Sequence, residues 1–141
     1  MGGTKRANAY SRFLKCEMVI CYKLRKKANY VDEIQVIGDV KDRNIVIVDD
    51  MVDTAGTLTL AAQMMIDKGA KSVRAATTHP VLSGDAYERI ENSPLKELLV
   101  TDSIPLKKES TKINVISIAD VFAEVINKVY NYQSISNSFI Q

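Results

Sequence analysis

The chain of 141 residues has no tryptophan, one histidine, two cysteines and three prolines. One histidine and two cysteines without metal-ligand spacing are too few ligands for a zinc centre. No apolar run approaches the ~20 residues of a membrane-spanning helix, and the glycine-rich, polar N-terminus does not resemble a signal peptide. These shortages predict a soluble, cytoplasmic protein with no membrane partner.

The chain also lacks a large excess of charge of one sign, because it has 19 basic and 17 acidic residues and a formal net charge of +2. So small an excess gives no argument for a nucleic-acid partner. The length and the 46% hydrophobic content are typical of one globular domain. Without a secretory signal, Cys16 and Cys21 are expected to be reduced thiols in the core rather than a disulfide.

The most informative stretch covers residues 45–57. Its first four residues are β-branched and apolar, which predicts a strand of a parallel sheet buried on both faces. Two acids, Asp49 and Asp50, follow at the expected end of this strand. Before a helical pattern over 58–68 come five further residues of interest: Asp53, Thr54, Ala55, Gly56 and Thr57.

A strand, a tight turn and a helix N-terminus together form an anion site, because free backbone N–H groups and the helix dipole point at the bound group. Thr54 and Thr57 add hydroxyl donors, and Gly56 lets a phosphate approach the backbone. Asp49 and Asp50 suit a sugar diol or a Mg²⁺ ion, although two acids can also simply solvate a strand end. The pattern therefore predicts a sugar-phosphate site at the carboxyl end of a parallel strand.

This stretch resembles the ribose-phosphate-binding motif of phosphoribosyltransferase folds. Four flanking stretches, at residues 2–7, 23–25, 37–40 and 81–84, occur in the same order in the ribose-phosphate pyrophosphokinase family, which the whole chain resembles. The Asp of the family motif that contains Gly2 and Gly3 would precede Met1. The resemblance thus implies that residues 1–141 form the C-terminal, ribose 5-phosphate-binding half, and that the N-terminal half of the family is absent.

Alternating periodicities predict an α/β fold, with a mostly parallel central sheet of about five strands flanked by helices. Residues 45–48 are expected to be the central strand. The resemblance adds that the fold is like that of type I phosphoribosyltransferases. The predicted strands cover 17–22, 35–40, 45–48, 72–78, 97–100 and 113–116, and the predicted helices cover 4–15, 58–68, 83–92 and a segment after a capping box of Ser117 and Asp120.

The resemblance implies Mg²⁺-dependent transfer of diphosphate from ATP to ribose 5-phosphate, which yields 5-phosphoribosyl diphosphate for nucleotide biosynthesis. Most of the ATP site would belong to the absent half, so the fragment is expected to be inactive alone. Gly2 and Gly3 would form a loop facing the diphosphate, and Asp49 and Asp50 would bind ribose hydroxyls and Mg²⁺. The other ribose 5-phosphate contacts would come from Asp53, Thr54, Ala55, Gly56 and Thr57.

Lys23 and Arg25 open a basic stretch that, by composition alone, is typical of a solvated face or a nucleic-acid patch. The family resemblance instead implies that both are catalytic. Negative charge builds on the transferred group and on the leaving oxygen during diphosphoryl transfer, and cations can neutralise it.

Two further segments resemble regulatory parts of the family, with phosphate or ADP as effectors. They contain Ser83 and Gly84, and Ser134 and Ser136. A serine-rich tail is by itself more typical of disorder. Family members also assemble as homo-oligomers.

Two other functions stay open. A free-standing phosphoribosyltransferase would transfer ribose phosphate to a base, but no base-recognition segment is evident. A non-catalytic subunit related to the synthetase would bind ligand or assemble without turnover. Release of AMP from ATP would separate the first hypothesis from the phosphoribosyltransferase.

Overall fold

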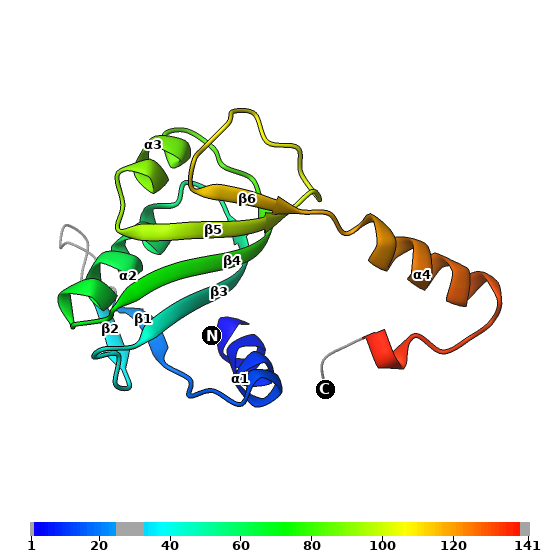
Figure 1. Ribbon diagram of the computed structural model, residues 1–141, viewed down its shortest axis with the longest axis horizontal. Helices are drawn as coiled ribbons and strands as arrows, with labels where there is room; N and C mark the ends of the chain where they lie inside the picture. The colour runs from blue at the N-terminus through cyan, green and yellow to red at the C-terminus, as the bar shows by residue number, and fades with distance from the viewer. Residues whose placement is uncertain (1, 25–32, 139–141) are drawn as a thin grey trace.

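A computed structural model describes residues 2–24 and 33–138 (Figure 1). The helices are α1 (Gly2–Leu14), α2 (Gly56–Asp67), α3 (Ala86–Glu91), α4 (Ala119–Tyr130) and the short 3₁₀ helix η1 (Ser136–Ser138). The strands are β1 (Ile20–Leu24), β2 (Glu33–Ile37), β3 (Asn44–Val52), β4 (Ser72–Pro80), β5 (Leu95–Thr101) and β6 (Ile113–Ile116).

The main sheet has four parallel strands in the order β3-β4-β5-β6. Helices α2 and α3 pack on this sheet and share one core cluster with it, to which α2 contributes Ala62 and Met65 and α3 contributes Ile90. Strand β3, helix α2 and strand β4 form a parallel crossover unit, as the order of the sequence patterns predicts. The α/β fold is therefore confirmed.

The prediction of about five strands in one sheet is wrong for the described part of the chain. Strands β1 and β2 pair with each other, antiparallel, and form a separate two-stranded sheet. Strand β3 is an edge strand rather than the central one, and the side chain of Val46 is 59% exposed. A run of β-branched residues indicates a strand that can be buried on both faces, but it does not specify the position of that strand in the sheet.

Helix α4 also departs from its sequence pattern. The sequence places apolar residues along one face of this helix, and such a face is usually buried, yet none of its residues is buried and Phe122 is 58% exposed. Figure 1 shows α4 extending beyond β6, away from the sheet. The predicted capping box forms only in part: the Ser117 hydroxyl accepts a hydrogen bond from the Ala119 N–H at 3.3 Å and donates to Asp102, but within the described residues no bond from Asp120 completes the box.

Both cysteines are free and exposed, so their expected place in the core is wrong. Cys21 lies in β1, which pairs with β2 alone and therefore offers little surface for burial. Within the described residues, none of the helices combines the length and the apolar character that crossing a membrane would require.

The core contains a polar side chain, Thr77 on β4. Thr77 is 6% exposed, and its hydroxyl makes no hydrogen bond with any residue that the structure describes. We expect Thr77→Val to raise the free energy of unfolding by about 1 kcal/mol, because it replaces an unpaired buried hydroxyl by a methyl group of similar size. Urea unfolding measures this gain, and Thr78→Val, at the exposed neighbouring position, is the matched control. Equal effects of both substitutions would contradict the prediction.

Candidate functional site

The loop between β3 and α2 lies at the carboxyl end of the parallel sheet, where α/β folds bind ligands. Its last residue, Ala55, is the N-cap of α2, with a left-handed backbone (φ 60°, ψ −1°) and a side chain that is only 4% exposed. No acceptor within the described residues takes a hydrogen bond from the N–H groups of residues 55–58. These four donors and the helix dipole are the features that make the loop a candidate anion site.

The two acids precede this loop but lie inside β3, which continues to Val52. The Arg6 guanidinium of α1 reaches both, with Nη1 3.6 Å from Asp49 Oδ1 and Nη2 3.3 Å from Asp50 Oδ2. The Asp50 N–H also donates to Asp49 Oδ1 at 2.9 Å. Arg6 therefore occupies the position in which a bound cation would meet these carboxylates.

The two carboxyl groups titrate as a pair, with pKa values displaced in opposite directions. Partial burial is the main cause that raises the pKa of Asp49, and the neighbouring Asp50 charge adds to it. A hydrogen bond with Asp49 is the main cause that lowers the pKa of Asp50, with a further contribution from Arg6. Because the side chains are more than half exposed, water screens the interactions with Arg6.

The segment that follows β4 lies against the loop. The N–H groups of Leu82 and Ser83 donate to the carbonyl groups of Val52 and Asp53, at 3.1 and 3.2 Å. The Ser83 hydroxyl donates to the Asp53 carboxylate. Ser83 and the adjacent Gly84 are therefore placed beside the candidate anion site, while their regulatory role stays a prediction.

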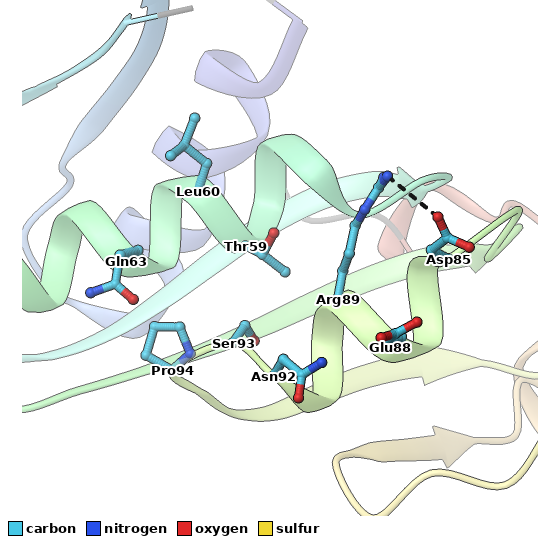
Figure 2. A pocket seen from close by; sticks show the side chains of 9 residues that line it. All are labelled: Thr59, Leu60, Gln63, Asp85, Glu88, Arg89, Asn92, Ser93 and Pro94. Atoms are coloured by element: carbon cyan, nitrogen blue, oxygen red, sulfur yellow. Dashed lines mark ion pairs between the residues drawn. The ribbon is translucent and has the colours of Figure 1, made fainter. Parts of the chain in front are cut away.

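Helix α3 adds a residue that no sequence motif indicates. Arg89 Nη1 donates to the Thr54 carbonyl oxygen at 2.9 Å. Its side chain also lines an open groove of about 520 Å³ between α2 and α3, drawn in Figure 2. A single arginine on a six-residue helix matches no motif, so only the packing of α3 against α2 identifies it.

Among the other predicted site residues, Gly2, Gly3, Ser134 and Ser136 make no hydrogen bond with this loop in the part of the chain that the structure describes. Gly2 and Gly3 form the first turn of α1, so the expected loop is wrong; glycine accepts a helical backbone at a cost of roughly 0.5–1 kcal/mol relative to alanine. Lys23 lies in β1, and Arg25 lies outside the described residues. Ser134 and Ser136 bond to each other near η1, beyond α4 (Figure 1).

The carboxylates of Asp49 and Asp50 fit a Mg²⁺ ion whose remaining ligands would come from water and from the bound substrate. Within residues 2–24 and 33–138, no three His, Cys, Asp or Glu side chains gather in a metal-binding group. Asp49 and Asp50 nevertheless provide adjacent carboxylate oxygens. Mg²⁺ commonly takes one or two carboxylates and fills its shell with water and substrate phosphates.

Comparison with known proteins identifies the family that this chain is similar to. The profile of the family described as the phosphoribosyl synthetase-associated domain matches residues 17–140. A ribose-phosphate pyrophosphokinase of Porphyromonas gingivalis is 48% identical over 139 residues, which cover 99% of this chain and 44% of that protein. One from Campylobacter jejuni is 50% identical over 140 residues, covering 99% and 45%.

A solved structure is also similar. The crystal structure of phosphoribosylpyrophosphate synthetase from Mycobacterium smegmatis superposes with a TM-score of 0.84 at 30% identity, covering 94% of this chain and 43% of that one. The chain thus spans less than half the length of these relatives, 44% and 45% for the two pyrophosphokinases.

Proposed function

Since the chain belongs to the ribose-phosphate pyrophosphokinase family, we propose that it provides the ribose 5-phosphate site of an enzyme that makes 5-phosphoribosyl diphosphate. The enzyme transfers diphosphate from ATP to the sugar and releases AMP. The chain corresponds to the C-terminal half of such an enzyme, with a fold of the type I phosphoribosyltransferase kind. Alone, it binds ligand without turnover.

The observation that carries this proposal is the junction of β3 and α2. Four backbone N–H groups without acceptors suit the 5-phosphate, and two adjacent carboxylates precede them along the chain. In this assignment the phosphate lies over residues 53–57, where Thr54 and Thr57 add hydroxyl donors. Asp49 and Asp50 accept hydrogen bonds from the ribose hydroxyls and hold Mg²⁺, which neutralises charge on the phosphate oxygens of ATP.

The chemistry itself needs cations, and the two arginines that the described residues bring here already have partners: Arg6 pairs with Asp49 and Asp50, and Arg89 donates to Thr54. During transfer, the anomeric hydroxyl of ribose 5-phosphate attacks the β-phosphorus of ATP, and charge builds on the leaving AMP oxygen. We assign its neutralisation to Lys23 and Arg25. Most of the ATP site lies in the part of the enzyme that corresponds to the relatives' sequence outside this match, and the assembled enzyme is a cytoplasmic homo-oligomer that responds to phosphate or ADP.

Calorimetric titration of the chain with ribose 5-phosphate and Mg²⁺ tests the proposal. We expect saturable binding that weakens about tenfold or more in Asp50→Asn and in Thr57→Val, because each removes a polar contact to the ligand. The matched controls are Asp67→Asn, which neutralises an exposed acid at the other end of α2, and Thr57→Ser, which keeps the hydroxyl.

Both controls are expected to bind like the wild type. No binding by a cooperatively folded wild-type chain would contradict the proposal for the isolated chain. Equal binding by all variants would move the ligand to another site. If ATP is then supplied with the complementary half of a relative, release of AMP separates diphosphoryl transfer from transfer of ribose phosphate to a base.

A further inference from the structure

We propose that Arg89 is a positioning residue that fixes the orientation of the peptide between Thr54 and Ala55, and thereby the phosphate-binding loop. This inference rests on the proposed function, because it assigns the loop to a phosphate. Arg89 lies on α3, which is remote in sequence from β3 and the start of α2. Its side chain lines the groove between α2 and α3 (Figure 2) and extends from there to the loop.

The geometry gives Arg89 a specific contact. Its Nη1 donates to the Thr54 carbonyl oxygen at 2.9 Å, which is a normal length for a charge-assisted hydrogen bond. A Cβ atom at Gly56 would lie 3.8 Å from the same Nη1, so the guanidinium also lies against the first residue of α2. Arg89 therefore bonds to the residue before Ala55 and lies near the residue after it.

The planar peptide bond links this contact to the anion site. In a trans peptide the N–H points opposite to the carbonyl oxygen, so a Thr54 carbonyl held by Arg89 directs the Ala55 N–H away from the guanidinium. The same peptide leads into the left-handed backbone of Ala55, a conformation that costs a non-glycine residue energy. A loop held in this way presents its donors before the anion arrives, which removes the cost of ordering them.

The neighbouring ion pair does not account for this arrangement. Arg89 Nη2 lies 3.8 Å from Asp85 Oδ2 at an i,i+4 spacing, with side chains 45% and 75% exposed. Exposed ion pairs of this kind contribute little to stability, so the pair with Asp85 does not explain the position of the Arg89 side chain. The positive charge of Arg89 would also attract a bound phosphate directly. The substitution Arg89→Lys keeps this attraction, so it separates the effect of charge from positioning of the loop.

Four proteins test the inference: the wild type, Arg89→Met, Arg89→Lys and the control Asp85→Asn. Backbone amide NMR signals of Ala55 and Gly56 report the loop, and calorimetry reports the affinity for ribose 5-phosphate with Mg²⁺. We expect Arg89→Met to shift both amide signals without ligand and to weaken binding about tenfold, the equivalent of one charge-assisted hydrogen bond. Arg89→Lys should recover part of the affinity, and Asp85→Asn should leave signals and affinity unchanged.

The outcomes separate this inference from the proposed function. If the wild type binds and Arg89→Met binds equally well with unshifted signals, the positioning role is wrong and the proposed function stands. If Arg89→Lys restores full affinity and added salt removes the difference, charge attraction replaces positioning. If the wild type does not bind, the proposed function fails, and the Ala55 and Gly56 signals alone decide whether Arg89 fixes the loop.

Discussion

Replacing Ala55 by valine is expected to lower the free energy of unfolding by about 3 kcal/mol and to abolish ribose 5-phosphate binding. Ala55 has φ 60°, where a β-branched side chain is strongly disfavoured. Its methyl group belongs to the buried core cluster, so two added methyl groups would also overpack that core. Either response, a changed backbone or a displaced helix, moves the N–H groups of residues 55–58. Thermal or urea unfolding and calorimetric titration measure the two effects.

Ala55→Gly is the matched control, because glycine accepts a positive φ without strain. It relieves the left-handed conformation but loses more backbone entropy on folding, and the two effects cancel to within about 1 kcal/mol. We therefore expect nearly unchanged stability and retained ribose 5-phosphate binding. If valine and glycine at this position behave alike, neither the φ of Ala55 nor its packing controls the loop.

The sequence predicts the β3–α2 junction well because all of its signals are local. A β-branched run followed by small residues and an amphipathic pattern is sufficient to predict a strand, a turn and a helix. Glycine is a typical residue just after a helix, and Gly69 there has φ +90° and donates its N–H to the carbonyl oxygen of Ile66 at the end of α2. The parallel pairing of β3 with β4 then follows from the handedness of crossovers.

The parts that sequence reasoning missed depend on contacts between distant residues. Nothing in residues 45–48 distinguishes an edge strand from a central one, since the difference depends on what pairs beside it. The apolar stripe of α4 specifies a helix but not the surface it covers, and within the described residues it covers none. Arg89 contacts Thr54 across 35 positions of sequence, so its role is visible only after α3 has packed beside α2.

The pair of acids combines both kinds of information. The sequence predicts that Asp49 and Asp50 are adjacent, but their opposite pKa displacements come from burial, from their mutual hydrogen bond and from Arg6 on α1. Since the pKa of Asp50 is lowered, its contribution to stability is present above the ordinary aspartate pKa and is lost as pH falls. The pKa of Asp49 is raised, so its contribution to stability changes with pH in the opposite direction: the charged form is disfavoured in the folded chain, and this cost is relieved as pH falls.

Arg6→Gln is expected to increase the affinity for Mg²⁺ about fivefold, because the solvent-screened ion pairs that Arg6 makes with Asp49 and Asp50 compete with a bound cation. Loss of the guanidinium also raises both carboxyl pKa values, so Mg²⁺ binding should disappear at a higher pH on acidification than in the wild type. Calorimetric titration of Mg²⁺ at several pH values measures both effects.

Asp50→Asn and Arg12→Gln are the controls for this change. Asp50→Asn should weaken Mg²⁺ binding, whereas Arg12→Gln, which removes an exposed cation from the last turn of α1, should leave it unchanged. Weaker binding in Arg6→Gln would contradict direct competition and would mean that Arg6 orients the two carboxylates for the metal. If Arg6→Gln raises the Mg²⁺ affinity and adding Asp50→Asn cancels that gain, the cation binds between β3 and α1, where Arg6 meets the two acids.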